Sequence, residues 1–219
     1  MKAITAALLL ILSTTAFAQA PTPEQVAEWR TAADKGEAWA QSNLGQMYDR
    51  GDGVPQDSAV AMKWWTKAAE QGYAKAQYNL ALMYADGEGV PKDNATAGKW
   101  YTKAAEQGYA DAQLNLGLMY GNGLGVPQDD ATAVKWYTKA AEQGFASAQE
   151  NLAFLYAKGE GVPQDNVMAY MWWNLAAAQG DENAKENKGK LQDSMTSAQI
   201  EQAQILSREC LAKDYKDCG

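Results

Sequence analysis

A glycine returns every 36 residues along most of this chain, at Gly36, Gly72, Gly108, Gly144 and Gly180. A Val-Pro pair keeps the same interval, from Val54-Pro55 to Val162-Pro163. Residues 73–108 and 109–144 are identical at 27 of 36 positions. A period of this length predicts a solenoid, because each short unit can bury its apolar side only against its neighbours.

The 36-residue unit has the pattern of two helices joined by a turn. In residues 37–72 the first helix is indicated by small and apolar residues at helical spacing: Ala40, Leu44, Met47 and Tyr48. The segment Gly51–Pro55 interrupts it, since proline lacks an amide hydrogen and disfavours helix in its predecessor. Asp57 has the position of an N-cap for the second helix, and Gly72 that of a left-handed residue at its end.

The second helix of the unit combines small residues with tryptophan. We expect Ala61, Trp64, Ala68 and Ala69 to face inward, so that the alanines let two helices approach closely. The tryptophans that recur at this position are interpreted as core packing: Trp64, Trp100, Trp136 and Trp172. A ligand-stacking column is the alternative.

The period divides the chain into repeats with distinct ends. The predicted parts are a signal peptide (1–18), an N-terminal capping helix (19–36), four repeats (37–72, 73–108, 109–144 and 145–180), and C-terminal capping helices with a tail (181–219). In the fourth repeat Met171 and Leu175 replace the lysines at positions 63 and 67. We expect a C-terminal helix to pack over these two residues; a partner contact is the alternative.

The first residues have the features of an export signal. Lys2 precedes a short apolar run, and Ala16-Phe17-Ala18 matches a processing site. We expect cleavage after Ala18 and a periplasmic or secreted protein that does not insert into a membrane.

Composition excludes several classes of function. The chain contains no histidine, which removes the usual general base and the commonest metal ligand. Its formal net charge of −8 disfavours binding to nucleic acid or anionic lipid. The acidic glycine-rich loops do not repeat a calcium ligand set, because Asn122 and Leu124 stand where the preceding repeat has Asp86 and Glu88. The sequence predicts no catalytic residue, cofactor or metal site.

Two cysteines, Cys210 and Cys218, lie in the tail. In an oxidising compartment a pair this close is expected to form a disulfide. A free redox-active thiol pair is the alternative.

These patterns resemble the Sel-1-like repeat family, a relative of the tetratricopeptide repeat. The resemblance rests on A-x-A-Q-x-N-L, Y-x-x-G-x-G-V-P-x-D and A-x-x-W-x-x-x-A-A-x-Q-G, which recur across residues 37–180. It implies an all-α superhelix whose first helices line a concave surface, and a role in binding or assembling proteins. Some bacterial members carry a cysteine pair in each repeat and have been proposed to bind β-lactams; this chain lacks those pairs.

Positions that vary between repeats form one stripe on the first helix, at 39, 42, 46, 49 and their copies. Apolar residues gather there, which is typical of an interaction site. The predicted partner-binding residues are Trp39, Tyr78, Leu82, Leu114, Leu118 and Phe154. The alternative is that several of them pack between neighbouring repeats.

The sequence therefore predicts an exported, non-catalytic solenoid that binds a protein or peptide along its concave face. We expect a monomer, although no residue pattern sets the oligomeric state. Two alternatives stay open: a periplasmic immunity protein that neutralises a secreted toxin, and an envelope hydrolase of the β-lactam-binding type.

Overall fold

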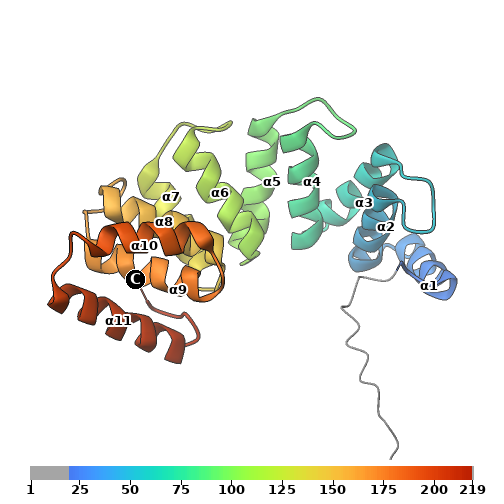
Figure 1. Cartoon of the computed structure of the whole chain (residues 1–219). Helices are drawn as coiled ribbons and strands as arrows, with labels where there is room; N and C mark the ends of the chain where they lie inside the picture. The colour runs from blue at the N-terminus through green and yellow to red at the C-terminus, as the bar shows by residue number, and fades with distance from the viewer. Residues whose placement is uncertain (1–19, 219) are drawn as a thin grey trace, which may run out of the picture.

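The computed structural model describes residues 20–218, so the predicted signal peptide lies outside the described residues. Within this range the chain forms eleven helices and no strand, following one another along an arch (Figure 1). The first helices of the repeats are α2 (Ala38–Arg50), α4 (Ala74–Asp86), α6 (Ala110–Asn122) and α8 (Ala146–Lys158). The second helices are α3 (Ser58–Glu70), α5 (Asn94–Glu106), α7 (Asp130–Ala141) and α9 (Asn166–Ala178). The predicted all-α solenoid is confirmed.

The helix boundaries follow the capping signals in the sequence. The Asp57 carboxylate accepts a hydrogen bond from the Val60 amide at 2.9 Å, and Asp93, Asp129 and Asp165 cap the later second helices in the same way. Gly72 follows the last turn of α3 with a φ of 90°. This left-handed turn redirects the chain into the next first helix within a few residues.

In the second, third and fourth repeats, the loop inside the repeat contacts the preceding repeat. Gly125 has a φ of 72°, and a Cβ added to it would lie 2.4 Å from the carbonyl carbon of Asn94 at the start of α5. Gly161 makes the corresponding close approach to Asp130 at the start of α7. Glycine at this position therefore permits both the turn and the contact between repeats.

The prediction that Trp64 faces inward is wrong by one residue. Trp65 is the buried one, with 4% of its surface exposed, and its copies Tyr101, Tyr137 and Trp173 are buried as well. With about 3.6 residues per turn, Trp65 falls in the middle of the face that Ala61, Ala68 and Ala69 form, whereas Trp64 falls at its edge.

In the first three repeats the tryptophan equivalent to Trp64 instead lies under a lysine. The Lys67 ammonium stands 4.4 Å from the centre of the Trp64 ring, and the Lys103–Trp100 and Lys139–Trp136 pairs repeat this arrangement at 4.1 and 4.7 Å. These three tryptophans are partly buried and pack against the edges of the cores of α2 to α6. They cover the core from the outside, where cation–π attraction adds to their burial.

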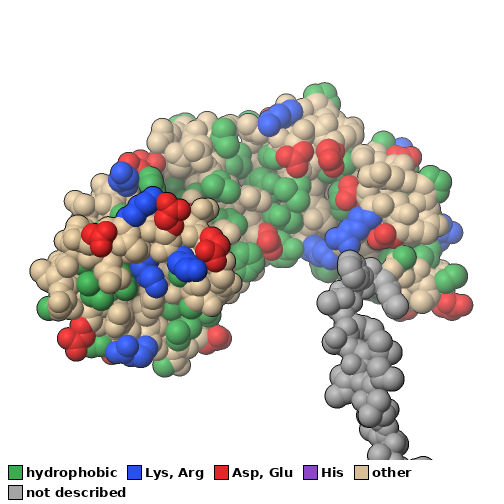
Figure 2. Space-filling model, in the orientation of Figure 1, with side chains coloured by type: hydrophobic (Ala, Val, Ile, Leu, Met, Phe, Trp, Pro, Cys, Tyr) green, Lys and Arg blue, Asp and Glu red, His purple; other side chains and the backbone are tan. Residues whose placement is uncertain are grey.

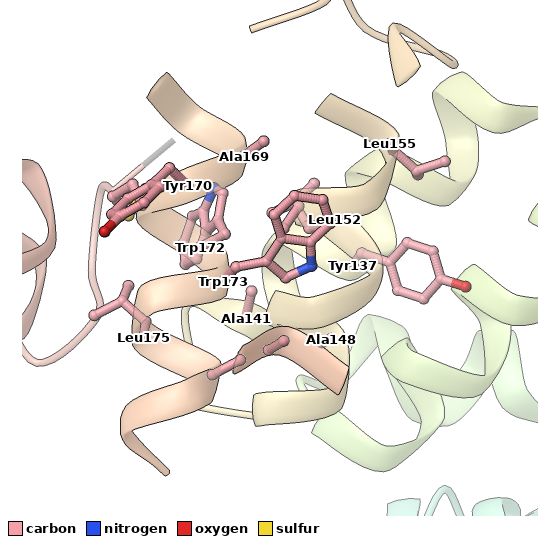
Figure 3. Packing of buried hydrophobic residues seen from close by; sticks show 14 of the residues in the cluster. Tyr137, Ala141, Ala148, Leu152, Leu155, Ala169, Tyr170, Trp172, Trp173 and Leu175 are labelled. Atoms are coloured by element: carbon pink, nitrogen blue, oxygen red, sulfur yellow. The ribbon is translucent and has the colours of Figure 1, made fainter. Parts of the chain in front are cut away.

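The fourth repeat differs because α11 (Ser197–Ala212) packs over α9. Met171, Trp172 and Leu175 are fully buried, and the Ser207 hydroxyl lies 3.4 Å from the Met171 carbonyl oxygen. Figure 3 shows Trp173 on the side of Leu152 and Tyr137, while Trp172 lies beside Tyr170. The prediction that a C-terminal helix covers Met171 and Leu175 is confirmed.

The remaining end helices close the array. Helix α1 (Pro23–Asp34) occupies the place of a second helix, and Gln41 of α2 bonds to its Ala33 carbonyl oxygen at 3.3 Å. Helix α10 (Glu182–Gln192) occupies the place of a fifth first helix; its one buried residue is Ala184. The otherwise polar α10 suits the end of a stack, which has no further repeat to cover it.

The C-terminal tail folds back onto the third repeat. Cys210 and Cys218 form a disulfide with a Cα–Cα distance of 5.3 Å. The Tyr215 ring lies against Gly144, where an added Cβ would come within 3.2 Å of it. Burial and the nearby Asp217 raise the pKa of the Glu142 carboxyl, which also faces the amides of Cys218 and Asp217. The disulfide therefore holds a loop that packs against the turn before α8.

Candidate protein-binding surface

The first helices border two hollows on one side of the arch. One hollow of about 410 Å³ is lined by α2, α4, the loop at Glu88 and the start of α6. A second, of about 280 Å³, is lined by α1, α2 and Lys75. The two share Gln46, Arg50 and Lys75, so they are continuous. Because three consecutive first helices border one hollow, this is the concave side of the arch.

Hydrophobic side chains gather in the hollow of the arch, as Figure 2 shows, with charged side chains toward its N-terminal end. Trp39 and Phe154 are exposed, at 37% and 43% of their surface. Tyr78, Leu82, Leu114 and Leu118 are each partly buried. The predicted residues thus lie on the first helices, but they differ in how much surface they offer to a partner.

Several of the predicted residues also pack between repeats. The Tyr78 ring lies 5.8 Å from the ring of Tyr101 in its own repeat and 5.1 Å from that of Tyr109 at the start of the next repeat. Leu82 packs beside the core of α4 to α6, and Leu114 and Leu118 pack beside the core of α7 to α9. Of these side chains, Tyr78 and Leu82 also line the larger hollow.

The predicted stripe is wrong at Ser42, which is fully buried. In the first repeat Trp65 covers this position, and its indole nitrogen donates to the Ser42 carbonyl oxygen at 3.1 Å. A small side chain fits beneath the indole, whereas the larger Tyr78 at the same position of the next repeat reaches the hollow.

Acidic residues around the larger hollow were not part of the prediction. Asp49, Asp86, Glu88 and Asp111 line it, together with the cations of Arg50 and Lys75. Among the described residues both ion pairs lie on α10, Lys185–Glu182 and Lys190–Glu186. Lys75 donates instead to the Gln46 side-chain oxygen at 2.9 Å. The four carboxylates of the hollow therefore have no ion-pair partner in the described part of the chain.

Three groups that line the hollow, Asp49, Tyr78 and Tyr109, have raised pKa values. Burial raises the pKa of Asp49, and the charge of Glu88 raises it further, by more than Arg50 lowers it. The pKa of Tyr78 is raised by burial and then by Asp111, and that of Tyr109 by the same two causes. Burial is the largest cause at each of these groups, and neighbouring carboxylates add to it.

Comparison with known protein families assigns the chain to one of them. A family model described as the Sel1 repeat matches residues 40–73, 74–109, 110–145 and 146–181. The chain belongs to the Sel1 repeat family. Its four matched repeats contain the four first helices α2, α4, α6 and α8.

Solved structures of Sel1 repeat proteins share this fold. A Sel1 repeat protein from Oxalobacter formigenes is 40% identical over 77% of this chain and 49% of its own, with a TM-score of 0.72. The protein c5321, a protective antigen of uropathogenic Escherichia coli strains, is 31% identical over 89% of this chain and 50% of its own, with a TM-score of 0.56. The chain spans about half the length of each of these two proteins.

An immunity protein from Pseudomonas aeruginosa, Pa5087, is 19% identical over 92% of this chain and 79% of its own, with a TM-score of 0.49. A similarity at this level gives no ground for transferring the immunity role to this chain. A search of curated proteins found no match. Within residues 20–218, no helix is both long enough and apolar enough to cross a membrane.

Proposed function

We propose that this Sel1 repeat protein binds a protein or peptide partner along its concave side and acts as a non-catalytic interaction scaffold. The observation that carries the proposal is where the repeats differ. Several buried positions keep the same residue in every repeat, as Ala40, Ala76, Ala112 and Ala148 do. A position that lines the hollow changes instead: Gln46 is followed by Leu82, Leu118 and Phe154.

The chemistry of the concave side supports a macromolecular partner. Two continuous hollows extend from α1 to the start of α6, so an extended segment could lie across three consecutive first helices. Grooves of this kind accept an extended segment or an amphipathic helix through apolar anchors. Phe154 and Leu82 occupy equivalent positions of their repeats and are the anchors that we assign.

We also propose that the protein acts outside the cytoplasm. The sequence of residues 1–18 has the pattern of a cleaved signal peptide. The Cys210–Cys218 disulfide suits an oxidising compartment.

Capture from an envelope extract tests the binding face. The bait is residues 19–219 as wild type, as the concave variant Leu82→Ala/Phe154→Ala, and as the convex control Lys67→Ala/Lys103→Ala, each with its melting temperature measured. We expect the concave variant to lose a captured protein that the convex control retains. Loss in the convex control with retention in a folded concave variant would contradict the proposal.

A further inference from the structure

The acidic hollow, defined by Asp49, Asp86, Glu88 and Asp111 around Tyr78, has a composition that the fold does not require. One repeat further along, the same four positions are occupied by uncharged residues: Ala85, Asn122, Leu124 and Ser147. The backbone arrangement is the same in both places, since α4 and α6 end in the same left-handed glycine. The repeats therefore act as an internal control, and the carboxylates mark a feature of the hollow rather than of the solenoid.

A positively charged side chain is the occupant that fits the acidic hollow. Its carboxylates have no ion-pair partner among the described residues, and Arg50 and Lys75 leave a net negative charge. No group of three acidic, cysteine or histidine residues in residues 20–218 is arranged to hold a metal ion. The walls include the rings of Tyr78 and Tyr109, and aromatic faces attract ammonium and guanidinium groups and cover their methylene stems.

The neighbouring part of the concave side is apolar. Leu82 lines the acidic hollow itself, and Leu114 takes the place of Tyr78 in the next repeat. Leu118 takes the place of Leu82, and Gly121 that of Asp49. A segment that extends from the acidic hollow toward α6 thus passes from carboxylates to leucines.

We infer that the partner segment places a lysine or arginine side chain in the acidic hollow and continues with apolar side chains over Leu82, Leu114 and Leu118. This inference rests on the proposed function, because it specifies the partner of the same concave side. The carboxylates give it charge selectivity, since an acidic side chain at this place would face four like charges. The leucines provide apolar contact area.

Labelled peptides of about twelve residues, which can extend over roughly 40 Å, test the inference. Each carries leucines at one end and Arg-Arg, Gln-Gln or Glu-Glu at the other. Fluorescence anisotropy measures their affinity for the wild type, for Asp49→Asn/Glu88→Gln, and for the control Glu160→Gln/Glu201→Gln. The control removes two exposed carboxylates outside the hollow and changes the net charge equally.

We expect the wild type and the control to bind the Arg peptide about tenfold more tightly than the Gln peptide, and the Glu peptide most weakly. Asp49→Asn/Glu88→Gln should lose this preference while its affinity for the Gln peptide is unchanged. Equal affinities of the three peptides, an equal loss in the control, or no binding of the Arg peptide would overturn the inference.

A Leu82→Ala variant separates this inference from the proposed function. If the Arg and Gln peptides bind equally and Leu82→Ala weakens both, the concave side binds peptides without charge selection, and only the inference fails. If Leu82→Ala and Asp49→Asn/Glu88→Gln both leave peptide binding unchanged, the concave side is not the binding face and both fail.

Discussion

Gln179 donates a hydrogen bond from its Nε2 atom to the Oε1 atom of Gln149 across 2.9 Å. Gln149 is fully buried, and its own Nε2 donates to the Ala141 carbonyl oxygen of the preceding second helix at 3.2 Å. The same pairing recurs in the other repeats, as Gln71–Gln41, Gln107–Gln77 and Gln143–Gln113. Each pair joins the two helices of one repeat, and the buried glutamine of the pair also bonds to the preceding second helix, so this ladder of carboxamides links consecutive repeats.

Replacing Gln149 with leucine should destabilise the fold. Gln149→Leu keeps the volume but removes both hydrogen bonds of this carboxamide, the one it donates to the Ala141 carbonyl oxygen and the one it accepts from Gln179. A typical intramolecular hydrogen bond contributes about 0.5–1.5 kcal/mol net, so a loss of this order per bond is expected. Urea unfolding measures the difference, with Gln202→Leu on the exposed side of α11 as the control. Equal stability of the two variants would show that the ladder contributes nothing.

Replacing either of two glycines of α6 with alanine should change the stability of the fold, in opposite directions. A Cβ at Gly117 would lie 2.6 Å from the Tyr137 ring, whereas a Cβ at Gly121 meets its nearest neighbour at 3.7 Å. We expect Gly117→Ala to destabilise by about 1–3 kcal/mol through overpacking. Gly121→Ala should stabilise by roughly 0.5–1 kcal/mol, because alanine has the higher helix propensity. Thermal and urea unfolding check both signs.

Loss of the disulfide should loosen the C-terminal cap. In the chain-entropy model, closing the loop between Cys210 and Cys218 stabilises the fold by about 2–3 kcal/mol. Cys210→Ser/Cys218→Ser should therefore melt at a lower temperature than the oxidised wild type. A reductant should lower the melting temperature of the wild type and leave the variant unchanged. Two free thiols in the unfolded, unreduced exported protein would contradict the pairing.

The Asp49 carboxyl should titrate above the ordinary range of aspartate. Burial is the first cause of its raised pKa, and Glu88 is the second. We expect Glu88→Gln to move the titration midpoint of Asp49 downward in a carbon-detected NMR titration. An unchanged midpoint would mean that the two carboxylates do not sense each other.

The raised pKa of Asp49 also predicts how the stability of the fold changes with pH. A raised folded-state pKa means that Asp49 favours folding at pH values below its unfolded-state pKa, and that this contribution is lost as the pH rises through the folded-state pKa. Relative to Asp49→Asn, the wild type should thus lose stability as the pH rises across that window.

Much of the fold could be predicted from the sequence because the period repeats each signal four times. Asp57 and Gly72 marked the ends of α3 correctly, since a cap depends on a few local atoms. The choice between Trp64 and Trp65 was harder. Adjacent aromatics both lie near the apolar face, and packing against Gly45 and Ser42 of another helix decides which one is buried.

The acidic hollow could not be predicted from one repeat. Asp49 comes from α2, Glu88 from the loop after α4 and Asp111 from α6, so the curvature of the arch brings them around one space. The burial of Ser42 was likewise missed, because variability alone does not tell a surface position from one beneath a tryptophan.

Site-specific photo-crosslinking tests the concave binding face most directly. Benzoylphenylalanine would replace either Phe154, on the first helix α8 at the position equivalent to Leu82, or Trp136, on the second helix α7 beneath Lys139. After illumination in an envelope extract, we predict a covalent adduct with a protein at position 154 and none at position 136. Adducts at position 136 with none at position 154 would contradict the assignment.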